Sequence, residues 1–127
     1  MDNIQRPKVK NFKDLEIWKR SIKLVENIYA TTQNFPKEEI YGLASQLRRA
    51  AVSVPSNIAE GFSRASNREY EQFLHVSRGS CAEIITQIII SRNLNYMEGS
   101  KAEILLNETE EISKMTMSLI KKLTTND

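Results

Sequence analysis

Apolar residues recur every three or four positions along most of this chain, and no segment shows sustained alternation of apolar and polar residues. Such spacing is typical of amphipathic helices. The first stripe predicts a helix that faces the core with Leu15, Trp18, Ile22, Val25, Tyr29 and Thr32. We expect this helix to stop at residues 34–36, because Pro36 disfavours the helical conformation of the residue before it.

A second stripe begins just after this stop. Pro36, Glu38 and Glu39 suit the first turn of a helix, where the fixed φ of proline and acidic side chains are both favourable. The positions predicted to face the core are Ile40, Leu43, Leu47, Ala50, Ala51, Val54 and Ile58. Gly61 is predicted to end this helix as a left-handed cap.

Two further helices are predicted, each opened by a capping box in which a serine is followed three residues later by a glutamate. Ser66 with Glu69 opens the third helix, and Ser100 with Glu103 opens the fourth, after a turn at residues 95–99. The third stripe contains Tyr70, Phe73, Leu74, Ser77, Cys81, Ile84, Ile85 and Ile88, and the fourth contains Ile104, Leu105, Ile112, Met115, Leu119 and Leu123. The four helices and their short connections predict an all-α fold, an antiparallel up-down-up-down four-helix bundle.

Pro55 lies inside the second predicted helix, where a proline removes a backbone donor and costs about 3 kcal/mol. The apolar spacing keeps its phase across Pro55, so we predict one helix kinked at Pro55 rather than two helices with a loop. Small residues near it and on the third helix allow a close approach; they are Ala50, Ala51, Ser53, Ser56, Gly79 and Ser80. Close packing within one bundle and a contact between subunits both explain this face, and a catalytic or ligand site is the least favoured explanation.

The composition is that of a soluble protein made of one domain. The chain has 127 residues, of which 40% are hydrophobic and 27% are charged. Its single cysteine, Cys81, excludes an intramolecular disulfide and fits a reducing compartment. The sequence shows no signal peptide and no apolar run of the ~20 residues that span a membrane, so we expect a cytoplasmic protein.

Charge is unevenly distributed along the chain, although the net charge is only +2. Residues 1–24 carry a net +4 and residues 98–127 a net −2. Residues 1–11 are predicted to form a basic flexible N-terminal tail, ahead of the bundle domain at residues 12–125. This bias permits a nucleic-acid partner. The candidate nucleic-acid contacts are Lys8, Lys10, Lys19, Arg20, Lys23, Arg64 and Arg68.

The pattern contains no set of residues that would perform catalysis or bind a metal. His75 is the only histidine, and Cys81 falls on an apolar stripe, where it most simply fills core volume. No spacing of zinc ligands is found, so we expect a non-enzyme without a metal or a cofactor. Core packing is favoured over base stacking for Trp18 and Tyr29, whereas Tyr41 is not firmly placed.

Two stretches of the chain carry a specific resemblance. They are YGLASQLRRAAVSVPSNIAEGFSR at residues 41–64 and FLHVSRGSCAEIITQI at residues 73–88. Both resemble the signature of the family of four-helix bundle proteins, also known as 23S rRNA intervening-sequence proteins. The opening FKDLEIWKRSIKLVENIYATTQNFP and the closing ISKMTMSLIKKL fit as well, so the resemblance covers nearly all of residues 12–123.

The resemblance implies an antiparallel four-helix bundle that associates into a ring, typically a homopentamer. Related accessory proteins of diversity-generating retroelements bind nucleic acid and a reverse transcriptase through a basic surface, and the family implies no catalytic residue. The residues at its signature positions are Arg48, Arg49, Pro55, Ser56, Asn57, Glu60 and Gly61. Together with Ser53 and Gly79, they are the candidates for an interface or a structural role.

Two functions remain open at this point. The first is a ring-forming, non-enzymatic bundle that associates with RNA or DNA through basic surface patches. The alternative is an oligomeric scaffold that binds a protein partner and no nucleic acid. Neither function involves a membrane. For Arg49, a structural role in a network with Glu60 is favoured over a phosphate contact, although three helical turns are too far for direct pairing within one helix.

Overall fold

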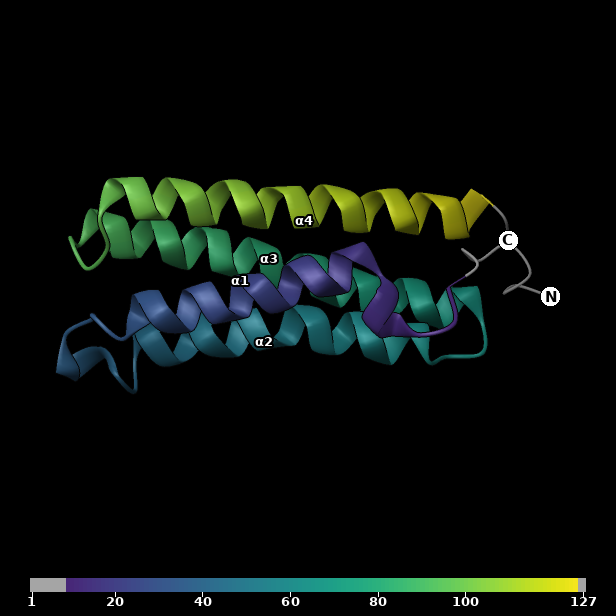
Figure 1. Ribbon diagram of the computed structural model, residues 1–127, viewed down its shortest axis with the longest axis horizontal. Coiled ribbons are helices and arrows are strands. Elements are labelled where there is room, and N and C mark those ends of the chain that lie inside the picture. Colours follow the sequence, from purple (N-terminus) through teal and green to yellow (C-terminus); the bar gives the residue numbers. More distant parts are fainter. Residues whose placement is uncertain (1–8, 126–127) are drawn as a thin grey trace.

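The computed structural model describes residues 9–125 as four long helices and two short 3-10 helices. The elements are η2 (Phe12–Asp14), α1 (Glu16–Thr32), η3 (Lys37–Glu39), α2 (Leu43–Phe62), α3 (Asn67–Asn93) and α4 (Gly99–Thr125). In Figure 1 the long helices lie lengthwise beside one another, and the chain reverses direction at each connection between them. The prediction of an all-α fold with four helices is confirmed, and the described range contains no strand. None of its helices is both long enough and apolar enough to cross a membrane.

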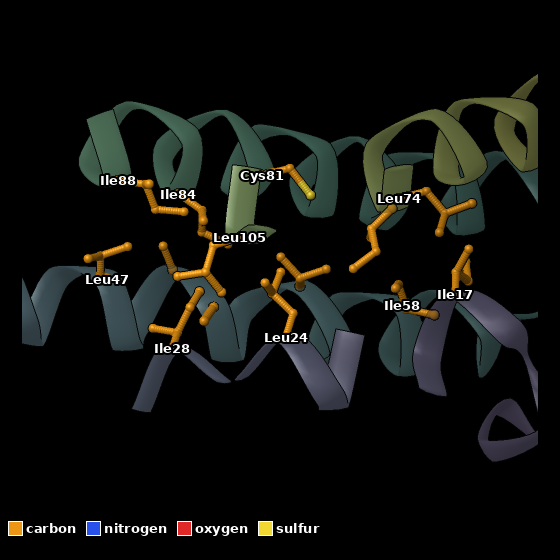
Figure 2. Packing of buried hydrophobic residues seen from close by; sticks show 14 of the residues in the cluster. Ile17, Leu24, Ile28, Leu47, Ile58, Leu74, Cys81, Ile84, Ile88 and Leu105 are labelled. Atoms are coloured by element: carbon orange, nitrogen blue, oxygen red, sulfur yellow. The ribbon is translucent and has the colours of Figure 1, made fainter. Parts of the chain in front are cut away.

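The hydrophobic core runs along the space between the four long helices. Figure 2 shows side chains from α1, α2, α3 and α4 meeting there. Those that are at most 1% exposed include Leu24, Ile28, Leu47, Ile58, Leu74, Ile84, Ile88, Leu105, Ile112 and Leu123. Full burial of one such side chain contributes ~1.5–3 kcal/mol, so this shared core is the main force that holds the helices together.

Only part of the stripe predicted for α1 is buried: Thr32 is buried as predicted, as is Leu15 just before the helix. The buried positions of α1 are Ile17, Ser21, Leu24, Ile28, Thr31 and Thr32. Of the predicted stripe, Trp18, Ile22 and Val25 are only half-buried and Tyr29 is 41% exposed. The rest of the core face could not be recognised from the apolar pattern, because it includes polar residues whose hydroxyls form hydrogen bonds within the helix. For example, Thr31 Oγ1 donates to the carbonyl oxygen of Asn27 at 2.8 Å.

Helix α2 begins later than predicted. Its first residue is Leu43, because Gly42 adopts φ −109° and ψ −114°, outside the helical region. The glutamates expected in its first turn lie in η3 instead, and Glu39 Oε1 accepts a hydrogen bond from the Leu43 N–H at 2.9 Å. Ile40 therefore does not face the core, and it is 52% exposed. Tyr41 is 96% exposed.

Helix α2 continues through Pro55, which confirms a single helix at this point and leaves the kink a prediction. Its end differs from the prediction, because Gly61 is a buried helical residue and no glycine of the described chain has a positive φ. A Cβ at Gly61 would lie 2.9 Å from Phe73 Cβ and 2.9 Å from Tyr70 Cδ1. Glycine is thus required at position 61 by the close approach of α3 and not by a left-handed cap.

The connections to α3 and α4 differ in how well they were predicted. Ser66 caps α3, since its Oγ accepts a hydrogen bond from the Glu69 N–H at 3.2 Å, as expected. The capping role predicted for Ser100 is wrong, because α4 already begins at Gly99. The turn before α4 instead depends on Asn95, whose φ is 64°, a left-handed conformation that asparagine tolerates.

Candidate interaction surfaces

The histidine, the cysteine and the acidic residues of the described chain do not come together as a metal site. Among residues 9–125 there is no group of three or more His, Cys, Asp or Glu side chains that could hold a metal ion. His75 is exposed on α3. Cys81 is 1% exposed, and desolvation raises the pKa of its thiol to about 11. The thiol is therefore neutral at pH 7 and fills core volume, as predicted from its position on the apolar stripe (Figure 2).

The basic residues of α1 have two different environments. Lys19 and Lys23 are exposed one helical turn apart. Arg20 is held by α4, because its Nε donates to Glu108 Oε1 at 2.9 Å and its Nη2 donates to Glu108 Oε2 at 3.2 Å. These hydrogen bonds raise the pKa of Arg20. Since a two-point contact with a carboxylate occupies the guanidinium, Arg20 connects α1 to α4 and leaves the lysines as the free cations.

A shallow hollow of about 330 Å³ lies beside these α1 residues. It is lined by Glu16, Lys19, Arg20, Lys23, Asn27, Ile104, Leu105 and Glu108. Two carboxylates thus stand among three cations. The α1 surface is consequently less basic than the run Lys19, Arg20 and Lys23 suggests in the sequence.

The remaining basic candidates lie apart from the α1 group. Lys8 falls outside the described residues, and Lys10 is exposed just before η2. Arg68 is exposed in the first turn of α3. Arg64 Nη2 forms an ion pair with Glu60 Oε2 at 2.8 Å, one helical turn away. Glu60 is therefore paired with Arg64 rather than with Arg49.

Several of the predicted interface residues pack within the chain, along the seam between α2 and α3. Ser80 Oγ donates to Ser53 Oγ at 2.8 Å, and Ser77 Oγ donates to the carbonyl oxygen of Val54 at 2.9 Å. Asn57 Nδ2 donates to the carbonyl oxygen of Ser53 at 2.8 Å. For Ser53 and Asn57, packing within one bundle accounts for the residue type.

The opposite side of α2 is open, and we call this surface the Pro55 groove. It is a hollow of about 280 Å³ between α1 and α2, lined by Trp18, Ile22, Val25, Val52, Pro55, Ser56 and Ala59. Val52 is 41% exposed and Ser56 is exposed. Three residues of the stripe predicted for α1 line this groove, Trp18, Ile22 and Val25, and of these Trp18 and Val25 also pack against the core. No part of the described chain covers it.

Gly79 does not mediate a close contact within the described chain. A Cβ at this position would meet nothing within 4 Å, and the residue is exposed on α3. The explanation that applies to Gly61, a helix that approaches too closely for a side chain, therefore does not extend to Gly79 within one chain.

One exposed surface could not be located from the sequence, which does not show the exposure of Tyr41, and we call it the Tyr–Arg corner. Its hollow of about 330 Å³ is lined by Tyr29, Ile40, Tyr41, Ser45, Arg48 and Arg49. The prediction that Tyr29 packs in the core is wrong. Its ring is covered on one side by Arg48, whose Cζ lies 4.6 Å from the ring centroid. The signal in the sequence was the apolar pair Ile40-Tyr41 directly before a glycine, which is unusual for a connection.

Comparison with known proteins places this arrangement among previously observed folds. A family model described as 23S rRNA-intervening sequence protein matches residues 13–118, from η2 into α4. The structure is similar to the crystal structure of a protein of unknown function from the S23 ribosomal protein family of Bacteroides thetaiotaomicron, with a TM-score of 0.75 and 20% sequence identity. That similarity covers 83% of this chain and 98% of the other. None of the curated proteins matches the sequence.

Proposed function

The chain belongs to the 23S rRNA-intervening sequence protein family, and from this premise we propose that it is a self-associating, non-enzymatic bundle whose basic surface binds nucleic acid. The bundle has the up-down-up-down antiparallel topology, and its second helix is kinked at Pro55. Copies associate through the Pro55 groove into a ring, which the resemblance suggests is a pentamer. Each copy contributes a few exposed cations to the surface of the ring.

The observation that best supports nucleic-acid binding is the environment of Lys19 and Lys23. Both are exposed on α1, one turn apart, and within residues 9–125 neither takes part in an ion pair. A cation that is free in the isolated protein can neutralise a phosphate without first losing a carboxylate partner. Arg20 and Arg64 lack this freedom, because they are paired with Glu108 and Glu60.

Self-association is supported by the apolar lining of the Pro55 groove. Half-buried Trp18, Ile22 and Val25 face exposed Val52 across it, and contact with a second copy would remove this surface from water. Assembly also multiplies the few free cations of one chain. Because several weak contacts on one particle act together, a ring can bind a polyanion that a single copy holds only weakly.

The test is light scattering after size exclusion, with absorbance recorded at 260 and 280 nm at low and high salt. We expect a multiple of the chain mass and co-purifying nucleic acid that high salt removes. In a binding titration with purified RNA and DNA, Lys19→Glu with Lys23→Glu should weaken binding and lower its salt dependence. The matched control is Lys101→Glu with Lys114→Glu, which changes the charge equally on exposed positions of α4. Equal loss of binding in both double variants would contradict a role for the α1 lysines.

A second function, a scaffold for a protein partner without nucleic acid, is favoured by one specific observation. Glu16 and Glu108 lie in the same hollow as the α1 cations, so this surface has mixed charge and suits a polar protein surface. This function predicts an assembly that carries no absorbance at 260 nm at any salt concentration.

A further inference from the structure

The Tyr–Arg corner exposes apolar surface that the fold does not use. Tyr41 is 96% exposed, Ile40 is 52% exposed and Tyr29 is 41% exposed. Single exposed apolar side chains are normal, whereas a contiguous exposed group marks an interaction site. The cause is local, because Gly42 delays the start of α2 and leaves Ile40 and Tyr41 in the connection. Tyr41 makes almost no contribution to the core, so the fold does not require an aromatic ring there.

Arg48 holds the ring of Tyr29 in place. Its Nε donates to Thr32 Oγ1 at 2.8 Å, and its Nη2 donates to the carbonyl oxygen of Tyr29 at 3.3 Å. The guanidinium carbon lies 4.6 Å from the centroid of the Tyr29 ring. These contacts satisfy the end of α1, which gives Arg48 a structural role. They also fix the plane of the Tyr29 ring before any partner binds, which reduces the entropy lost on binding.

The charge of the corner favours an anionic partner. Arg48 and Arg49 line its hollow, and no carboxylate does. Arg49 is exposed and forms no ion pair with residues 9–125. Of the nearby acids, Glu39 does not line the hollow, and its Oε1 accepts from the Leu43 N–H and its Oε2 from the Tyr96 hydroxyl. Glu38 is exposed but does not line the hollow.

We propose that the Tyr–Arg corner binds single-stranded nucleic acid, with Tyr29 and Tyr41 stacking on unpaired bases and Arg49 contacting a backbone phosphate. Aromatic rings beside arginines are how proteins hold single strands without reading their sequence. A duplex fits this corner poorly, because each base in a duplex is already stacked on both faces. The proposal rests on the proposed function and gives it a substrate class, since the α1 lysines alone do not distinguish single strands from duplexes.

The test is fluorescence anisotropy with a labelled oligothymidylate, the same strand made abasic, and a duplex of equal length. Tyr41→Ala should weaken binding of the oligothymidylate by about 5- to 150-fold, which corresponds to the loss of one stacked base. Tyr41→Phe keeps the ring and should bind as the wild type does. Val76→Ala on α3, where the valine is 51% exposed, controls for loss of exposed apolar surface. Because Tyr41 is almost fully exposed, neither variant at this position should impair folding.

The salt dependence separates stacking from charge. Tyr41→Ala should leave the slope of log K against log salt unchanged, since the ring is uncharged. Arg49→Ala should lower that slope by ~0.7, the value for one phosphate contact with a single strand. The abasic strand should bind wild type and Tyr41→Ala equally, because it has no bases to stack.

Four results would overturn the proposal. If Tyr41→Ala binds the oligothymidylate like the wild type, the corner does not stack bases, and the proposed function stands without it. If the wild type binds neither strands nor duplex, both proposals fail. Polyglutamate that displaces the strand from wild type and Tyr41→Ala equally would indicate a site for acidic polymers only. Loss of the assembly in Tyr41→Ala, with unchanged binding, would show that a second copy covers the corner.

Discussion

The two sides of α2 differ in how closely the rest of the chain packs against them. On the side of α3, Gly61 lies against Tyr70 and Phe73, and the hydroxyl of Ser77 reaches the backbone of α2. On the side of α1, Pro55 and Val52 line a groove that nothing in the described chain fills. The structure reveals that α3 closes one side of α2, whereas the other side, beside α1, keeps an open groove, which we propose a second copy fills.

The largest effect on stability should come from adding a side chain on the side of α2 that packs against α3. Gly61→Val would place a Cβ 2.9 Å from Phe73 Cβ and 3.1 Å from the carbonyl oxygen of Tyr70, a backbone atom that cannot move freely. Overpacking of this kind costs about 1–3 kcal/mol, so we expect a lower free energy of unfolding in urea. Unchanged stability would mean that α2 and α3 are not as close as described.

The free energy of unfolding should also depend on pH, because the thiol of Cys81 is buried in the core. The pKa of the Cys81 thiol is about 11 in the folded protein against an ordinary value of 9.0. Between these values the folded state keeps a proton that the unfolded state has lost. The free energy of unfolding should therefore fall as the pH rises from about 9 to about 11, by up to about 3 kcal/mol. Cys81→Ala removes this contribution.

The measurement is urea unfolding of the wild type and Cys81→Ala across that pH range. Other groups titrate there as well, but they do so in both proteins. The wild type should lose more stability than the variant. Parallel curves would contradict a buried thiol at this position.

A smaller effect of opposite sign is expected at the exposed glycine of α3. Gly79→Ala meets no atom within 4 Å, so it should raise stability by about 0.5–1 kcal/mol through helix propensity alone. Thermal unfolding would detect the gain, and light scattering would show whether the mass is unchanged. If the variant loses its assembly, Gly79 is a contact between copies, as the small residues at this position suggested.

The sequence was sufficient to predict the helices but not all of their faces. The recurrence of apolar residues every three or four positions predicts each of the four long helices, because burial of one apolar stripe is what stabilises a helix in a protein. In α1 two adjacent sides carry apolar residues, and spacing alone cannot indicate which one meets the core. Because Ser21 and Thr31 lie on the core face, the neighbouring side with Trp18, Ile22 and Val25 looks more apolar in the sequence.

The candidate surfaces were predictable only in part, because exposure and pairing are tertiary properties. The exposed Lys19 and Lys23 could be found from their charge, whereas the carboxylate that occupies Arg20 comes from Glu108, far away in the sequence. Similarly, the exposure of Tyr41 depends on where α2 begins, which is set by the backbone of Gly42. The Tyr–Arg corner could therefore be recognised only in the structure.

The central claim is that the open side of α2 is the surface through which copies associate. The most direct test is the molar mass by light scattering of wild type, Val52→Glu and Val76→Glu, with circular dichroism to confirm folding. The two valines are comparably exposed, at 41% and 51%, but only Val52 lines the Pro55 groove. We predict a multiple of the chain mass for wild type and Val76→Glu, and a folded monomer for Val52→Glu. A monomeric wild type, or an intact assembly in Val52→Glu, would contradict the claim.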